Sequence, residues 1–112
     1  MADKSNFLER IPCKNSAYSY TADNNGIVTI EIENRGVFNR FAQLILKKPK
    51  TSYIHLDEFG SFVWEQCNGE NNIIDIGKEV QQKFGDSANP LYERLSKFIK
   101  MLADYGFLKW HN

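Results

Sequence analysis

The C-terminal half of the chain carries three apolar stripes at helical spacing, separated only by short polar turns. The pattern predicts helices over about 57–67, 72–84 and 90–105. Asp57 is placed to cap the first helix, and Gly60 interrupts it at a cost of about 1 kcal/mol relative to alanine. Such a glycine indicates that another backbone comes close to it. Three amphipathic helices must bury their apolar faces against one another or against a sheet, which limits the fold to a few layered arrangements.

Short β-prone segments precede these helices. Residues 18–21 and 27–33 flank an Asn25-Gly26 pair that suits a tight turn, and the second segment alternates β-branched and polar residues. Residues 51–56 have the composition of a third short strand. The order of a hairpin, a strand and three helices predicts an α+β, winged-helix-like fold. In this fold a small antiparallel β-sheet of three strands packs on a three-helix bundle.

A further amphipathic segment lies between the second and third strands. Residues 37–46 repeat apolar side chains at helical spacing, so we expect an extra short amphipathic helix there. From Arg35 to Lys50 the chain has five basic residues and no acidic one. A basic amphipathic helix can bind a membrane surface or an acidic partner, although docking on its own domain is the simpler interpretation. We interpret residues 1–16 as an N-terminal arm and residues 17–110 as a single domain.

The overall charge of the chain is balanced. Fourteen basic and fourteen acidic residues give a formal net charge of zero over 112 residues. A protein that binds nucleic acid through phosphates usually carries a basic excess, so the balance argues against a dedicated nucleic-acid binder. No apolar run approaches the ~20 residues needed to span a bilayer, and the N-terminus does not resemble a secretory signal. We therefore expect a cytoplasmic protein without membrane insertion.

Few residues carry reactive chemistry. The two cysteines, Cys13 and Cys67, and the two histidines do not have the spacing of a known metal site. We expect both thiols to be free, and Cys67 to be a small buried hydrophobe rather than a nucleophile. The pair Asp57-Glu58 at a helix start is typical of capping rather than of acid–base catalysis. We therefore expect no catalytic residue, no metal and no cofactor, and a protein that is not an enzyme.

Three segments of the C-terminal half resemble the PqqD family in their order and spacing. Residues 54–64 resemble its strand-to-helix signature, in which a Leu and an Asn or Asp precede a small-residue turn of helix and an apolar-Trp pair. Residues 68–76 are similar to its following Asp-Gly turn and second helix, and residues 102–108 are similar to the end of its last helix. The resemblance covers about 51–109, and the segment 37–46 is then an insertion relative to the shortest members.

The resemblance implies a non-catalytic peptide-binding adaptor. In this family the leader of a ribosomally synthesised precursor peptide adds as an extra strand beside the segment that corresponds to residues 51–56, in a cleft walled by the last helix. In the namesake pathway the adaptor brings the precursor to a radical SAM enzyme, so a modifying enzyme of this type is the second implied partner. The residues that we expect to contact the peptide are Thr51, Ser52, Tyr53, Ile54, His55, Leu91, Tyr92, Arg94, Leu95, Lys97, Phe98 and Met101.

Other interpretations of these residues stay open. Leu95 and Phe98 lie on the apolar stripe and are typical of an ordinary core. Arg94 and Lys97 are typical of a solvated helix face, and His55 is typical of a strand residue with ordinary hydrogen bonds. The alternative function is a winged-helix DNA-binding transcriptional regulator, and a third is a scaffold subunit that contacts a larger enzyme through the extra helix. A free strand edge is compatible with either a monomer or a homodimer.

Overall fold

In the computed structural model of the chain, the described part comprises residues 7–33 and 51–111. It has the predicted α+β character, with antiparallel strands and three helices that follow β4. The strands are β1 (Pro12–Lys14), β2 (Ser19–Ala22), β3 (Val28–Glu33), β4 (Thr51–His55) and β5 (Leu108–Trp110). The helices are α3 (Glu58–Gln66), α4 (Ile73–Phe84), the 3₁₀ helix η2 (Gly85–Ala88) and α5 (Leu91–Asp104).

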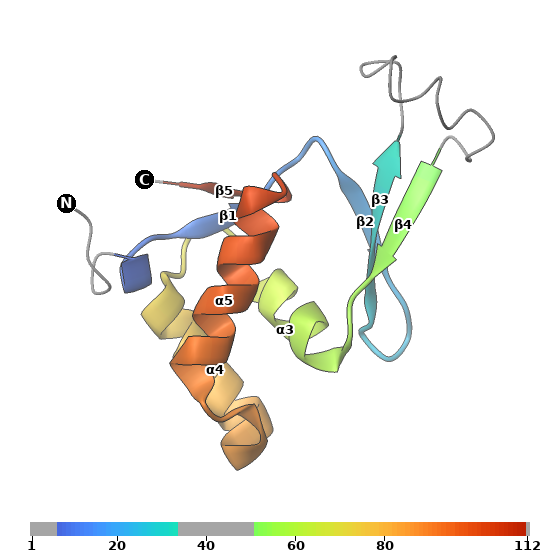
Figure 1. Ribbon diagram of the computed structural model, residues 1–112. Coiled ribbons are helices and arrows are strands. Elements are labelled where there is room, and N and C mark those ends of the chain that lie inside the picture. Colours follow the sequence, from blue (N-terminus) through green and yellow to red (C-terminus); the bar gives the residue numbers. More distant parts are fainter. Residues whose placement is uncertain (1–6, 34–50, 112) are drawn as a thin grey trace.

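The strands β2, β3 and β4 form an antiparallel sheet in that order. One face of this sheet is apolar, since Ile30 on β3 pairs with Tyr20 on β2 and with Ile54 on β4. Val28 and Ile30 on this inner face are fully buried. Figure 1 shows α5 standing across from the sheet, with α3 between them. The inner face of the sheet and the helices therefore enclose the core.

The largest fully buried side chain of this core is Trp64 on α3. Its ring meets that of Tyr20 edge-on at a centroid distance of 5.4 Å, which joins the helix to the sheet. Buried apolar side chains from all three helices belong to the same core cluster and include Val63, Ile73, Ile76, Val80, Leu95, Ile99 and Leu102. Burial of such side chains stabilises a fold by about 1.5–3 kcal/mol each, so the helical stripes are the main source of stability.

A two-stranded antiparallel ribbon joins the two ends of the described chain. β1 pairs with β5 and places Pro12 opposite Trp110, whose ring also meets that of Phe7 at a centroid distance of 5.6 Å. The backbone N–H of Lys14 donates to the carbonyl of Cys67 at 3.2 Å, which ties β1 to the end of α3. No strand was predicted in the N-terminal arm, because β1 depends on a partner at the other end of the chain.

The predicted helices and strands that fall on described residues are confirmed to within one residue at each end. Local signals account for this agreement. Asp57 caps α3 by accepting from the N–H of Gly60 at 2.7 Å, and Asn72 and Asp75 form a reciprocal capping box at the start of α4. The predicted extra helix over 37–46 lies outside the described residues.

A buried hydroxyl closes the junction between β4 and α3. The N–H of Leu56 donates to the carbonyl of Val28 at 2.9 Å, as in an ordinary antiparallel ladder. The reciprocal bond is replaced by Ser61, whose Oγ accepts from the N–H of Val28 at 2.8 Å and donates to the carbonyl of Leu56 at 3.5 Å. Because Ser61 lies in the first turn of α3, one side chain bonds the sheet to the helix.

We expect Ser61→Ala to lower the free energy of unfolding by about 1–3 kcal/mol, because the buried N–H of Val28 would lose its partner. Urea denaturation followed by tryptophan fluorescence measures the change. The matched control is Ser16→Ala at an exposed position, where the change should stay within about 0.5 kcal/mol. Equal stability of the two variants would contradict the role assigned to Ser61.

Candidate functional site

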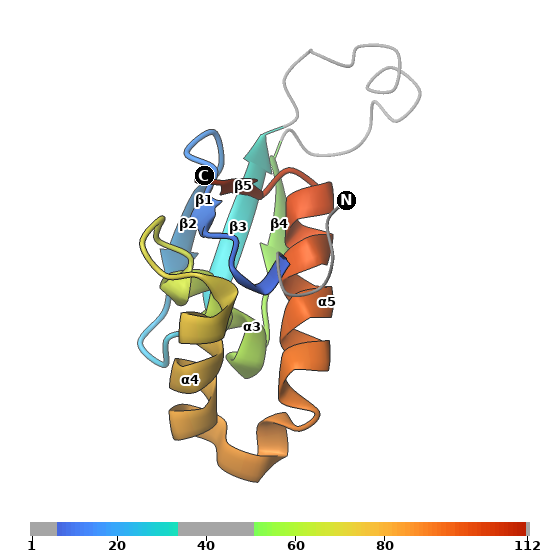
Figure 2. The same ribbon diagram turned by 90° about the vertical axis from the view of Figure 1, so that its left-hand side faces the viewer.

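β4 is a border strand of its sheet, and no further strand pairs with it within the part of the chain that the structure describes. The N–H of Leu56 points toward β3, and Ile54, two residues earlier, shares this orientation. Because backbone groups alternate along an antiparallel strand, Tyr53 and His55 turn their N–H and C=O groups away from β3. In the view of Figure 2, β4 occupies the border of the sheet on the side of α5.

The side chains of β4 alternate between the two faces of the sheet. Tyr53 is 57% exposed on the outer face. His55 lies on the same face, where its Nδ1 is 2.9 Å from the Oγ1 of Thr29. Ile54 is half-buried on the inner face and packs against the core. The other predicted residues of this strand are Thr51, which begins it, and Ser52, which is half-buried.

One flank of α5 and its C-cap carries side chains at positions i, i+4, i+7 and i+11. These side chains, which we call the α5 flank, are Arg94, Phe98, Met101 and Tyr105. The first two contact Phe59 near the start of α3, where the Arg94 guanidinium lies 4.4 Å and the Phe98 ring 6.1 Å from its ring centroid. Met101 and Tyr105 are 43% and 68% exposed. The α5 flank therefore begins beside Phe59 on α3 and ends in an exposed apolar surface.

Tyr105 was not among the predicted site residues, because it follows the apolar stripe and caps the helix at its C-terminus. Its spacing of four residues from Met101 is the signal that identifies it. Lys97 is exposed and neighbours Arg94 and Met101 on the helix surface. The charge that Lys97 contributes to this side of α5 is therefore accessible to solvent.

The structure does not bring all the predicted residues of α5 to this flank. Leu95 is completely buried in the core, and its predicted contact with a peptide stays a prediction. Tyr92 faces α4, where its hydroxyl donates to the carbonyl of Ile74 at 3.2 Å and its ring lies against Gly77. Leu91 is half-buried and packs against the core. These three side chains join α5 to the rest of the fold.

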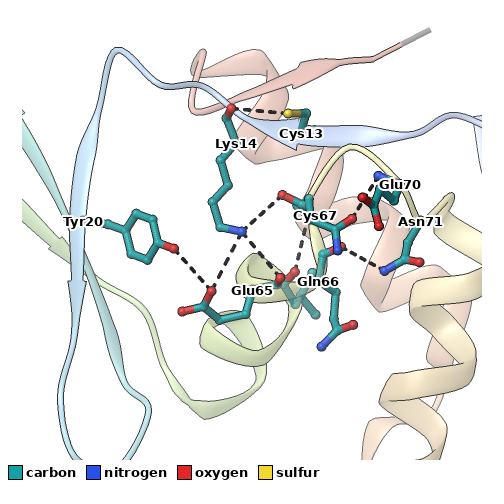
Figure 3. A network of polar contacts seen from close by, with 10 residues as sticks. Cys13, Lys14, Tyr20, Glu65, Gln66, Cys67, Glu70 and Asn71 are labelled. Atoms are coloured by element: carbon teal, nitrogen blue, oxygen red, sulfur yellow. Dashed lines mark hydrogen bonds and ion pairs between the residues drawn. The ribbon is translucent and has the colours of Figure 1, made fainter.

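A polar cluster away from the α5 flank holds β1 against α3 (Figure 3). The Lys14 ammonium donates to the carbonyls of Glu65 and Cys67, at 3.4 and 3.3 Å, and lies 3.8 Å from the Glu65 carboxylate. The Tyr20 hydroxyl donates to the same carboxylate at 3.4 Å. Burial, and then the Glu65 charge, raise the pKa of Tyr20. A cation on the last carbonyls of a helix stabilises its C-terminus, so we interpret this cluster as structural.

The described residues contain neither a metal-binding cluster nor a disulfide. No group of three or more His, Cys, Asp or Glu side chains among them lies close enough together to hold a metal ion. Both cysteines are free, as predicted. Burial raises the pKa of Cys67 from 9.0 to about 12, so its thiol stays protonated near neutral pH. None of the helices within residues 7–33 and 51–111 is both long and apolar enough to cross a membrane.

We expect Cys67 to be protected from alkylation in the folded protein, because a pKa of about 12 instead of 9.0 lowers the fraction of its thiol that is ionised about a thousandfold. The Cys13→Ser variant isolates this thiol, and mass spectrometry after iodoacetamide treatment measures the rate with and without urea. The unfolded thiol loses its proton near pH 9 while the folded one keeps it to about pH 12. The free energy of unfolding should therefore fall as the pH rises through this range. Equal rates of alkylation in the folded and unfolded protein would contradict this burial.

Comparison with known proteins gives one family match. The model of the family described as Coenzyme PQQ synthesis protein D (PqqD) matches residues 43–108, which is more than half of the chain. The matched segment includes β4, α3, α4 and α5. Curated proteins give no match, and solved structures give none either.

Proposed function

The chain belongs to the PqqD family, and on that premise we propose that it is a non-catalytic, peptide-binding accessory protein. It binds the leader of a ribosomally synthesised precursor peptide by strand addition along β4 and presents the precursor to a modifying enzyme of the radical SAM type. The observation that carries the proposal is the outer edge of β4, where Tyr53 and His55 direct their backbone groups away from the sheet.

Strand addition suits a ligand whose sequence varies. Main-chain hydrogen bonds to the N–H and C=O groups of Tyr53 and His55 supply affinity whatever the side chains of the peptide are. Alternate peptide side chains then fall on the two faces of the extended sheet. On the outer face they meet Tyr53 and His55, and on the inner face they meet Ile54. Specificity therefore arises mainly on the inner face, where apolar surface is available.

The α5 flank supplies the second surface of the proposed site. Phe98 is half-buried and Met101 and Tyr105 are exposed, so an incoming peptide can bury apolar area on them. Lys97 beside them is exposed and suits an acidic side chain of the peptide. Arg94 has a different role in the fold. It donates to the carbonyl of Ser87 at 2.9 Å, and its guanidinium stacks on the ring of Phe59 in α3.

The same proposal covers the partners and the arrangement of the helices. We propose that α3, α4 and α5 form a winged-helix-like trio that acts as a rigid support for the peptide, with no cofactor of its own. The precursor and the modifying enzyme are then the two partners. A border strand that is free to bind a peptide is also free to pair with a second copy, so the peptide-free protein is either a monomer or a homodimer.

Tyr53→Pro tests strand addition directly. Proline removes the N–H of Tyr53, which points away from β3, and leaves the ladder between β3 and β4 intact. We expect the leader peptide of the precursor to bind the variant about tenfold or more weakly than wild type, because loss of one backbone hydrogen bond costs about 1 kcal/mol and the rigid ring hinders pairing. Isothermal titration calorimetry measures the affinity.

The matched control is Tyr53→Ala, which removes the exposed ring and keeps the N–H. It should weaken binding less than Tyr53→Pro does, and circular dichroism should show that both variants are folded. Equal binding by the two variants would count against pairing at β4. Tight, salt-sensitive binding of duplex DNA without any binding of the leader would favour the DNA-binding regulator instead.

A further inference from the structure

The outer face of the sheet formed by β2, β3 and β4 carries polar side chains and lies on the side away from the described helices (Figure 1). The register of the three strands places six described side chains on this face, namely Ser19, Thr21, Thr29, Glu31, Tyr53 and His55. The members on β2 and β4 are exposed, and the two on β3 are half-buried. Among the six, only Glu31 is a carboxylate.

Glu31 and Tyr53 are direct neighbours across β3 and β4. Because Tyr53 turns its backbone groups away from β3, the two residues form a non-hydrogen-bonded pair, the type in which cross-strand side chains come closest. The Tyr53 side chain is 57% exposed. Within residues 7–33 and 51–111, no ion pair involves the Glu31 carboxylate. The pair therefore presents an accessible ring beside a carboxylate without a counter-ion among the described residues.

The same combination of a tyrosine and a glutamate holds a cation elsewhere in the protein. The Lys14 ammonium lies 5.8 Å from the centroid of the Tyr20 ring and 3.8 Å from the Glu65 carboxylate. The face of an aromatic ring attracts a cation, and the carboxylate adds a charge–charge attraction. Side chains of these types are thus suited to a lysine or an arginine, and on the outer face of the sheet that cation has to come from another molecule or from outside the described residues.

We propose that Glu31 and Tyr53 select a basic side chain of the leader, a lysine or an arginine, on the outer face of the sheet. This inference rests on the proposed function, because the leader has to pair with β4. A strand added there lies about 4.7–4.9 Å from β4, and its residue opposite Tyr53 points to the same outer face. A long basic side chain at that position crosses the Tyr53 ring and reaches the Glu31 carboxylate one strand further on. An acidic side chain there is repelled by Glu31.

The test neutralises the basic residues of the leader one at a time. Isothermal titration calorimetry measures the binding of the synthetic leader peptide after each lysine is replaced by norleucine or each arginine by citrulline. We expect one of these replacements to weaken binding to wild type about fivefold, because an exposed ion pair and a cation–π contact each contribute modestly. The same replacement should weaken binding to Glu31→Gln and to Tyr53→Leu by a smaller factor, because each variant has lost one of the two contacts.

Charge reversal gives the sharper comparison. In a second peptide, the basic residue found in this way is replaced by glutamate. We expect wild type to prefer the natural leader and Glu31→Lys to prefer the glutamate peptide. The matched control is Glu79→Lys, which reverses a charge at an exposed position of α4 and should keep the preference of wild type. Because each preference is measured between two peptides on one variant, a general loss of stability does not imitate the reversal.

Three outcomes would decide against the proposal in different ways. If no basic residue of the leader matters for binding to wild type, or if Glu31→Lys keeps the preference of wild type, the inference is wrong. Strand addition would still stand in either case, provided that Tyr53→Pro weakens binding as expected. If the synthetic leader does not bind wild type at all, the proposed function fails, and this inference fails with it.

Discussion

The bond that Ser61 makes across the end of β4 is the constraint on which the rest of the arrangement depends. Its hydroxyl takes the place of one rung of the ladder between Val28 and Leu56, so the sheet ends and the helix begins at one point. The first turn of α3 is thereby fixed to the sheet. Phe59 and Gly60 belong to this turn, and Arg94 and Phe98 of α5 pack on them, so this turn sets the position of α5 relative to β4. The border strand and the helix opposite it are consequently parts of one rigid frame.

That frame explains why the two surfaces of the candidate site come from distant parts of the sequence yet stay in a fixed relation. β4 offers backbone groups, which recognise an extended chain but not its side chains. In the proposed function, the α5 flank supplies apolar area for peptide side chains, since Phe98 is half-buried and Met101 and Tyr105 are exposed. In the proposed function, neither surface alone provides both affinity and selectivity for the peptide. The cluster around Lys14 stabilises the opposite end of α3, so the helix that joins the two surfaces is held at both ends.

The helices and the hairpin were predictable because their signals are local: apolar spacing, the Asp57 cap and the Asn25-Gly26 turn are read within a few residues. β1 could not be predicted in this way, since three residues form a strand only when they pair with a partner, here β5 at the other end of the chain. On α5, the spacing of apolar residues alone does not show which of Leu95 and Phe98 lies in the core and which lies nearer the surface. Both lie on the apolar stripe, and only packing shows that the first is completely buried and the second lies at its edge. Tyr105 was not predicted because it is exposed and follows the apolar stripe, although its spacing of four residues from Met101 places it on the same flank. Gly60 is approached by the ring of Phe98 and not, as the sequence suggested, by another backbone.

The ribbon of β1 and β5 has a practical consequence for how the domain can be connected to other proteins. It brings Pro12 and Trp110 together, on the side of the molecule away from β4 (Figure 1). The two ends of the described chain therefore lie close together, since the ring of Phe7 also contacts that of Trp110. A partner fused at either end of the described chain is therefore attached beside the β1–β5 ribbon.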